Sequence, residues 1–541
     1  MLIRLEIKSR ETAKMSFRIG SALVIVASFH VSAGVLSVSI QDKMGSPTAA
    51  RVYLVGQDGV PVFPKDTIVY DKVRPDGASE RNFVPRGGVF TTEAPAGKYI
   101  ITVEKGKEYV PERAEILVPE SGSVKRTIRL RRWVTMADRG WFSGDMHVHR
   151  ALSDLAVLME AEDLSVSIPM TRWKAGKAVN QDVDLDRFLA AADESGVFHA
   201  GVRFFPVLNE ELEPHASALL ASWLRRTPVA LDYPLAAFGQ AVAKSGGVSD
   251  SEKATSLELP ALAAVGACGT VGLANNHLWR SGSFTSEWGA WPGAMLGKYE
   301  ENCSGYAQSG FDMYSALLNA GFPLKLSAGT ASGVHPVPPG WSRIYVRTSG
   351  PLTPEGWLDG LRKGKSFVTT GPMLMLRVNG REPGDEIRKE RFPVNLDIAV
   401  EMLSPNPIAQ CEVVVNGDAH VVELKADAHD ANSYRGTLSL TIHSSSWITA
   451  RWKAARGSSC DVAHTSPVYV WNGKQPIPVR KEEIRHLLAA VDRLIKQVTS
   501  GDRPDDIITD GDDLRQRTLD YLGQAREVYQ QKLLDSSGTR H

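Results

Sequence analysis

The segment Asp-Met-His-Val-His at residues 145–149 carries two imidazoles and one carboxylate at alternate positions. In an extended strand, residues two apart point to the same face, so Asp145, His147 and His149 can all approach one point. Neutral imidazole binds zinc, manganese or iron alike. The spacing indicates a divalent metal site without identifying the ion. Two histidines at the end of a strand also fit an ordinary polar surface.

The composition is that of a globular protein rather than a nucleic-acid binder. A chain of 541 residues should contain about three to four domains. Its 62 basic and 62 acidic residues give a formal net charge of zero, without the basic excess expected for a protein that binds nucleic acid. After residue 34, no stretch approaches the roughly 20 apolar residues that an integral membrane span needs.

The first 34 residues have the layout of a secretory signal peptide. A basic lead precedes the apolar run at 19–31, and the small residues at 31–33 offer a cleavage site. We therefore expect export to the periplasm or the extracellular space, with Met15 as a second candidate start. The alternative is a short amphipathic or buried helix. The basic residues of the lead are Arg4, Lys8, Arg10, Lys14 and Arg18.

The four cysteines are Cys268, Cys303, Cys411 and Cys460. An oxidising compartment would permit a disulfide within each sequence-adjacent pair, Cys268 with Cys303 and Cys411 with Cys460. Free buried thiols fit equally well.

Four regions follow the predicted signal peptide. Short alternating strands separated by turns predict a β-sandwich over residues 35–133. Mixed helices and short strands predict an α/β region over 134–372, in which Thr353 and Pro354 begin a helix. Alternating strands predict a second, Ig-like β-sandwich over 373–472. Apolar residues at three-four spacing predict a helical tail over 473–541. We expect this tail to pack on a sandwich, or alternatively to form a dimerising helical pair.

An ordered series of motifs in residues 134–472 resembles the PHP-like metallohydrolases of the CehA/McbA (carbaryl hydrolase) family. The resemblance implies a multidomain protein in which an irregular PHP-like β/α barrel lies between the two β-sandwiches and holds a divalent metal ion at its strand ends. The segment 95–99 resembles carboxypeptidase-regulatory-like sandwiches. The family motifs are residues 144–150, 161–164, 272–277, 314–321, 327–333, 343–346, 367–372 and 463–467.

The resemblance also implies a ligand set. His147 and His149 match the family's first metal motif, and Glu210 or Glu211 and then His277 match the later ligands. Taken alone, Glu210 and Glu211 each fit a solvated surface charge, and His277 fits a hydrogen-bonded loop histidine. The weaker candidates are Glu162, Asp163, His335 and His464, the last of which is expected to serve in packing.

Two positions depart from the family pattern. Related barrels end their metal set with a Gly-Ser-Asp-x-His loop, whereas here Ala331 occupies the carboxylate position. Trp173 stands where the pattern offers a histidine, and its indole cannot bind a metal ion. We therefore expect a reduced site, in which three protein ligands and a water bind a single ion.

These features predict an exported metal-dependent hydrolase of an ester, carbamate or phosphoester, acting on a small molecule or a polymer. Metal-activated water would attack, Arg343 or Arg150 would hold an anionic oxygen, and Asp145 would orient a ligand imidazole. Each arginine also fits a structural salt bridge. The alternatives are a degenerate barrel that binds a ligand such as glycan, and a purely structural envelope protein.

Overall fold

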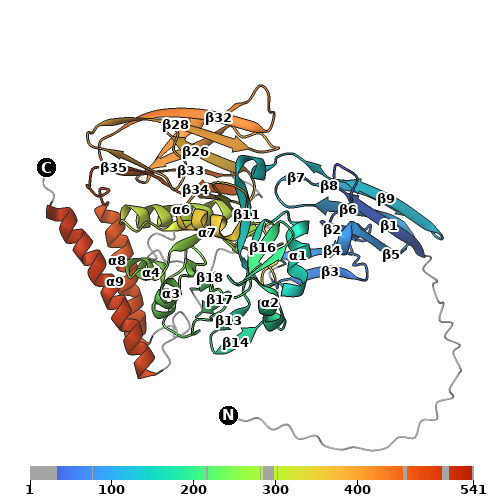
Figure 1. Ribbon diagram of the computed structural model, residues 1–541, viewed down its shortest axis with the longest axis horizontal. Coiled ribbons are helices and arrows are strands. Elements are labelled where there is room, and N and C mark those ends of the chain that lie inside the picture. Colours follow the sequence, from blue (N-terminus) through green and yellow to red (C-terminus); the bar gives the residue numbers. More distant parts are fainter. Residues whose placement is uncertain are drawn as a thin grey trace, which may run out of the picture.

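The computed structural model of the chain describes residues 33–75, 77–214, 217–280, 282–283, 298–300, 302–454, 460–501 and 511–538. The predicted signal peptide at 1–34 lies, except for its last two residues, outside this part. Three β-rich parts and two tail helices follow one another along the chain (Figure 1). Among the described residues, no helix combines the length and the apolarity needed to cross a bilayer.

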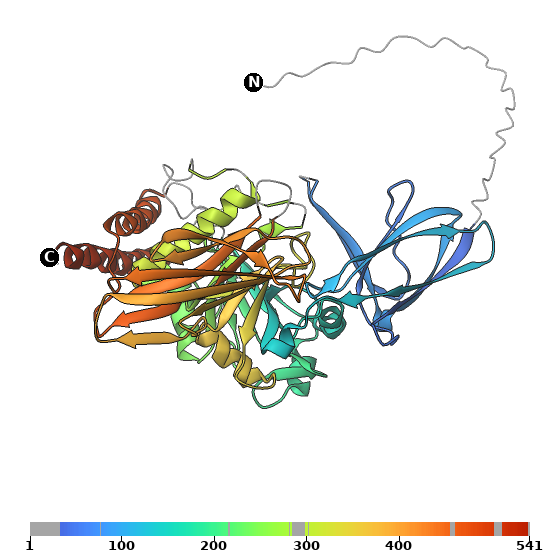
Figure 2. The same cartoon turned by 90° about the horizontal axis from the view of Figure 1, so that it is seen from above.

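The N-terminal part consists of two sheets around one apolar core, and it projects from the rest of the molecule (Figure 2). Residues of β1 alternate between buried and partly exposed, as expected for a strand with one face on a core. The first sheet contains β5 (Val89–Pro95), β1 (Ala33–Gln41) and β9 (Ser123–Arg129). The second contains β3 (Thr67–Val73), β4 (Ser79–Pro85), β2 (Arg51–Gly56), β6 (Gly97–Glu104) and β8 (Glu112–Val118). The short alternating strands expected over residues 35–133 are therefore present. A short pair, β7 (Tyr109–Val110) with β10 (Arg131–Arg132), leads into the central part.

Two sheets and most of the shorter helices form the central part. In the first sheet, β11 (Trp141–Val148), β12 (Val166–Pro169) and β16 (Arg203–Pro206) are parallel neighbours, and β15 (Val197–Ala200) flanks β16. In the second, β19 (Val248–Ser251), β20 (Thr270–Ala274) and β23 (Lys325–Ala328) are parallel neighbours. The same sheet continues through β18 (Leu219–Ser222), β17 (Glu210–Glu213), β13 (Arg172–Ala175) and β14 (Ala178–Gln181). The helices are α1 (Leu152–Ala161), α2 (Leu185–Ala191), α3 (Leu235–Lys244), α4 (Leu259–Ala264), α6 (Cys303–Asn319) and α7 (Pro354–Arg362).

Backbone hydrogen bonds join the two central sheets at the carboxyl end of β11. The amide of Ala331, just after β23, donates to the His147 carbonyl at 2.7 Å, and the His149 amide donates to the Ser332 carbonyl at 2.7 Å. The strand ends of β11, β20 and β23 therefore meet at one place, as the carboxyl ends of parallel strands do in many α/β sites.

The C-terminal β part shares a sheet with the central part. β24 (Arg343–Arg347), a neighbour of β11, pairs with β25 (Ser366–Thr369), which pairs with β34 (Val462–Thr465). Residue 372 lies in the bend between β25 of this sheet and the next strand, which belongs to the facing sheet. The sheet that contains β25 continues into β33 (Ser446–Lys453), β29 (Gln410–Val415), β30 (Asp418–Glu423), β35 (Val468–Asn472) and β27 (Glu386–Lys389). The facing sheet contains β26 (Met373–Val378), β28 (Val394–Leu403), β32 (Ser433–Ile442) and β31 (Lys425–Ala426).

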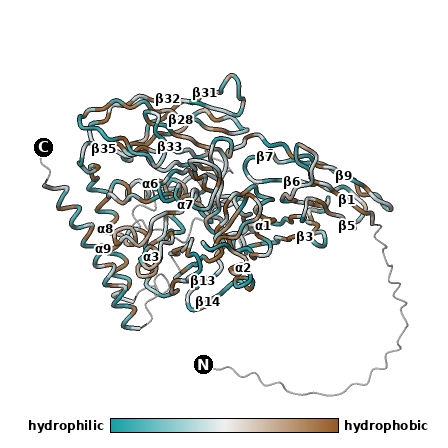
Figure 3. The backbone as a smooth tube through the Cα atoms, viewed as in Figure 1, coloured by the Kyte–Doolittle hydropathy of each residue, from teal (hydrophilic) through white to brown (hydrophobic). Residues whose placement is uncertain are grey.

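The tail forms two helices, α8 (Lys481–Ser500) and α9 (Asp512–Gly538), which lie side by side and pack against the central helices α4 and α6. Figure 3 shows hydrophilic and hydrophobic residues alternating along them, as expected for helices with one apolar face. Leu487, Val491 and Leu494 of α8 are fully buried. The expectation that the tail packs mainly on a sandwich was wrong, because its apolar faces cover central helices that would otherwise expose theirs.

Tail docking should depend on pH through Glu258, at the start of α4. This carboxyl is 1% exposed and accepts a hydrogen bond from the Tyr521 hydroxyl of α9. Burial raises the pKa of Glu258 to about 7, whereas an exposed glutamate titrates near ~4.3. Between these values the folded chain keeps a proton that the unfolded chain has lost. Stability therefore decreases as pH rises through this window, by at most about 1.4 kcal/mol per pH unit.

Urea unfolding of the wild type and of Glu258→Gln at pH 5, 6 and 7 tests this prediction. The amide does not titrate, so the free energy of unfolding of the variant should decline less with pH. Equal slopes for the two proteins would contradict it.

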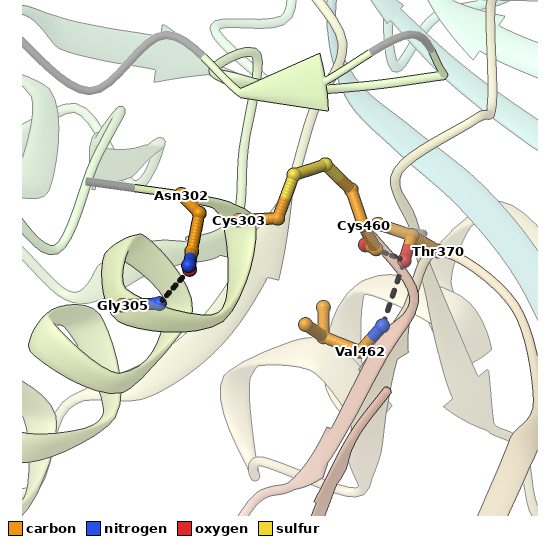
Figure 4. Close-up of a disulfide and its surroundings, with 6 residues drawn as sticks. All are labelled: Asn302, Cys303, Gly305, Thr370, Cys460 and Val462. Carbon is orange, nitrogen blue, oxygen red and sulfur yellow. Dashed lines mark hydrogen bonds between the residues drawn. A yellow bond between two sulfur atoms is a disulfide. The ribbon is translucent and has the colours of Figure 1, made fainter. Parts of the chain in front are cut away.

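A disulfide joins Cys303, at the start of α6, to Cys460, just before β34, with 5.1 Å between their Cα atoms (Figure 4). Both disulfides suggested by sequence adjacency were wrong: Cys268 and Cys411 are free and buried. The bridge spans 157 residues, because the continuous sheet brings β34 beside the central part. Asn302 caps α6 by accepting from the Gly305 amide at 3.0 Å. The carbonyl of Cys460 accepts from the Thr370 hydroxyl at 2.8 Å.

Cys303→Ser should lower the free energy of unfolding by about 2–4 kcal/mol, because the bridge restricts the unfolded chain. Urea titration of the oxidised wild type and of the variant measures this difference. A reductant should destabilise the wild type and leave the variant unchanged. Equal unfolding free energies for the oxidised wild type and the variant would contradict the prediction.

Candidate metal centre

Three potential ligand atoms converge where β11 ends. His147 lies in β11, His149 follows it, and Glu211 lies in β17 of the other central sheet. The His147 Nε2 atom is 3.0 Å from the His149 Nε2 atom. The Glu211 Oε2 atom is 2.9 Å from the His149 Nε2 atom and 3.4 Å from the His147 Nε2 atom. Among the described residues, these three form the group of histidine, cysteine and acidic side chains close enough to hold one ion.

The donor set fits a divalent ion. Zinc bonds to imidazole nitrogen and carboxylate oxygen are about 2.0–2.2 Å long, and a tetrahedron of such bonds has edges of about 3.3 Å. The three measured distances approximate one face of this tetrahedron, which leaves the fourth position for water or substrate. The Nδ1 atom of His149 has no hydrogen-bond partner in the described part of the chain, so its orientation depends on packing.

The electrostatics of the pocket favour a cation. Burial opposes charge on His147, yet Glu211 and Glu252 raise the pKa of this imidazole to about 10. Burial would raise the pKa of Glu211, yet the two histidines hold it well below its usual range. Burial, together with Glu211 and Glu252, raises the pKa of Glu213 to about 8. The raised pKa values of His147 and Glu213 reflect in part the buried negative charge of Glu211 and Glu252, which a divalent ion would compensate.

Glu252 and Lys253 are site residues that sequence reasoning missed. They follow β19, and their side chains are 4% and 2% exposed. The Glu252 carboxylate is 3.3 Å from the His147 Nδ1 atom, pairs with the Lys253 ammonium and accepts from the Asn276 amide. The sequence feature that could have indicated them is the run of polar and charged residues Ser-Asp-Ser-Glu-Lys at 249–253, which follows Val248.

Asp145 positions the backbone of the site rather than an imidazole ring. It is fully buried and accepts from the Thr330 hydroxyl at 2.6 Å, the Gly340 amide at 2.7 Å and the His147 amide at 3.1 Å. These bonds fix the loop after β23 against β11. Ala331 has a φ of 46° and contributes its backbone amide to this connection.

Strand alternation separates the two neighbouring glutamates. Glu211 faces the histidines, whereas Glu210 points to the opposite side of β17. There Glu210 pairs with Arg172 and accepts from the Val229 amide at 2.9 Å. Burial raises the pKa of Glu210 to about 7. Of the two glutamates proposed as ligands, the structure brings only Glu211 to the histidines.

His277 lies beside the three-residue group without being part of it. Its ring centroid is 5.8 Å from the Tyr306 ring and 5.9 Å from the His335 ring. Burial, with the charge of Lys253, lowers the pKa of His335 to about 3. Trp173 packs edge-on against His149, with 5.3 Å between ring centroids. Trp173 thus forms an aromatic wall of the site.

The other predicted residues lie in structural contacts. Arg343, fully buried, donates to the carbonyls of Gly340 at 2.7 Å and Glu162 at 3.0 Å. No contact joins it to the three-residue group among the described residues. Arg150 stacks on the Tyr70 ring, with 4.4 Å from its guanidinium carbon to the ring centroid.

The weaker candidates are likewise structural. Glu162 pairs with Arg51, and Asp163 with Arg132. His464 packs against the ring of Phe311, with 5.0 Å between centroids.

Comparison with known proteins leaves the family open. No family model and no curated protein matches the sequence. One part of the chain aligns with the solved structure of the Bacillus anthracis TIE protein, at 16% identity over 23% of this chain and 20% of that one, with a TM-score of 0.14. A streptococcal ancillary pilin aligns at 11% identity over 23% of this chain and 37% of that one, with a TM-score of 0.15. Phospholipase PlaB from Legionella pneumophila also aligns, at 15% identity over 19% of this chain and 25% of that one, with a TM-score of 0.12. This chain thus spans well under half of each of these proteins, and the TM-scores are too low to relate the folds.

Proposed function

We propose that the protein is an exported, metal-dependent hydrolase of an ester, carbamate or phosphoester, with a reduced PHP-like site of the CehA/McbA type. The observation that carries this proposal is the triangle of ligand atoms from His147, His149 and Glu211, with sides of 2.9–3.4 Å. The disulfide between Cys303 and Cys460 is compatible with export, since such bonds persist in oxidising compartments.

These three residues would hold the ion in the proposed reaction. A bound zinc, manganese or iron ion supplies a Lewis acid and lowers the pKa of its water. Glu252 contacts the outer nitrogen of His147 and so orients that ring, as carboxylates do for metal-binding histidines. The buried Lys253 ammonium balances Glu252 and places positive charge beside the pocket, where it would attract an anionic oxygen of the substrate.

The runner-up proposal is a binding module in which the metal holds a ligand without hydrolysing it. The position that related hydrolases fill with a carboxylate is Ala331, which has no ligand atom in its side chain. Trp173 beside His149 is equally unable to bind metal and offers an apolar surface to a ligand. Both replacements would limit the site to one ion.

Metal analysis and an ester screen test the proposal. Purified protein should contain about one divalent ion per chain, and His147→Ala with His149→Ala should remove it. A p-nitrophenyl ester, an aryl carbamate and bis(p-nitrophenyl) phosphate serve as probes, and chelation should abolish hydrolysis until the metal is restored. Wild-type protein without metal after loading would overturn the proposal. Stoichiometric metal without hydrolysis of any probe would favour the binding module.

A further inference from the structure

A second cavity, of about 460 Å³, lies where the N-terminal, central and C-terminal parts meet. Its walls include Tyr109 from the N-terminal part, Trp341 from the central part and Trp452 from β33. None of the three proposed metal ligands lines it. Its size is within the ~300–1,000 Å³ that small-molecule sites usually occupy. It is therefore a separate candidate binding site.

Four aromatic side chains contribute to its walls. Trp133, Trp341, Trp452 and Tyr109 all line the cavity, and all four are partly exposed. The Trp133 indole donates to the Lys107 carbonyl at 3.0 Å, which fixes this ring. Partly exposed indole faces are rigid apolar surfaces. They suit the flat C–H face of a sugar ring.

Lys107 is the polar group that stands out in this cavity. Its ammonium lies over the Trp341 ring, 3.2 Å from the centroid. It makes no hydrogen bond or ion pair within the described part of the chain, and burial lowers its pKa to about 7. Arg51 and Arg280 pair with Glu104. Arg343, fully buried, donates to backbone carbonyls through Nε and Nη2, and its Nη1 atom has no hydrogen-bond partner among the described residues. Lys107 is partly exposed, so an anionic ligand in the cavity can reach its ammonium.

The charges that line the cavity favour a single negative charge on the ligand. Four cations, Arg51, Lys107, Arg280 and Arg343, face three carboxylates, Glu104, Glu162 and Asp461. One positive charge is in excess. Among the described residues, the carboxylate of a ligand would match this excess.

We propose that this cavity binds a hexuronate, free or as a unit of an acidic glycan, whose carboxylate pairs with Lys107 and whose ring packs on the tryptophans. The site is independent of the proposed hydrolase activity. It would give the protein a carbohydrate-recognition site at the junction of its three parts. Each part contributes an aromatic side chain to this site.

Calorimetric titration of the full chain with glucuronate tests the proposal, with glucose and acetate as matched probes that lack the charge or the ring. Glucuronate should bind more tightly than either probe. Lys107→Met should weaken glucuronate binding at least about tenfold, which corresponds to about 1.4 kcal/mol. Lys65→Met, at an exposed lysine of the same part of the chain, should leave it unchanged.

Other outcomes overturn the inference. Absence of glucuronate binding, or equal binding of glucose, removes the role of the carboxylate. Equal binding of acetate removes the role of the ring. If Lys107→Met fails to fold, Lys107→Arg and Trp452→Leu keep the test decisive: the first keeps the charge and should bind, and the second should lose at least tenfold. Binding unaffected by Trp452→Leu contradicts the proposed site.

Discussion

Glu211→Gln should lose stoichiometric metal while the chain stays folded. In the proposed site the carboxylate would supply one of three ligand atoms, and its Oε2 atom is 2.9 Å from the His149 Nε2 atom. An amide oxygen carries no charge, so it is a weak ligand for a transition metal and leaves part of the positive charge uncompensated. Disturbing residues that merely support metal ligands costs about 10–100-fold in affinity. We expect loss of a ligand itself to reduce metal affinity at least about 100-fold.

Glu210→Gln is the matched control for this experiment. It makes the same chemical change one residue away, on the opposite side of β17, where Glu210 contacts Arg172 and Val229. Metal content measured after dialysis against a weak chelator should remain near wild type in Glu210→Gln and fall in Glu211→Gln. Circular dichroism checks that both variants fold. Equal metal content in the two variants would show that Glu211 is not a ligand.

The sequence predicted the part of the site that depends on local geometry. His147 and His149 share a face because they are two residues apart in a strand, and this holds whatever surrounds them. To choose between Glu210 and Glu211, one must know which face of β17 is turned toward the histidines at the end of β11. That depends on long-range packing and not on local sequence. Glu252 and Lys253 were missed because an acidic residue beside a lysine after a strand usually marks a solvated turn.

The fold was predictable to a similar extent. Strands with alternating burial, such as β1, and the helix capped by Thr353 follow from local pattern, and the structure contains them: the Thr353 hydroxyl accepts from the Gly356 amide at 3.0 Å. The connection of the central and C-terminal parts through β25 and β34 depends on a pairing between residues almost a hundred positions apart. Spacing along the chain carries no information about that pairing, and the disulfide between Cys303 and Cys460 was not among the pairs considered for this reason.

The largest loss of stability should come from Arg51→Met, which changes none of the three candidate metal ligands. Arg51 of β2 is 3% exposed and pairs with two buried carboxylates, Glu104 of the N-terminal part and Glu162 after α1. Burial alone would raise the pKa of Glu104, but the charges of Arg51 and Arg280 lower it to about 2. Removing one partner from a buried ion pair costs about 3–5 kcal/mol, because the remaining charge is left buried. We expect a loss of this size in the free energy of urea unfolding.

Second substitutions separate the charge effect from lost packing. Arg51→Met combined with Glu162→Gln should recover part of the stability, because a neutral amide costs less to bury than an unpaired carboxylate. Arg81→Met breaks an arginine–carboxylate pair of similar geometry on the surface of the same part, with Asp71 at 2.6 Å, and should change stability far less. If Arg51→Met proved as mild as Arg81→Met, the Arg51 network would not hold the N-terminal part against the centre. If the double variant were no more stable than Arg51→Met, the loss of the guanidinium's own hydrogen bonds and contacts, rather than an unpaired buried carboxylate, would explain the effect.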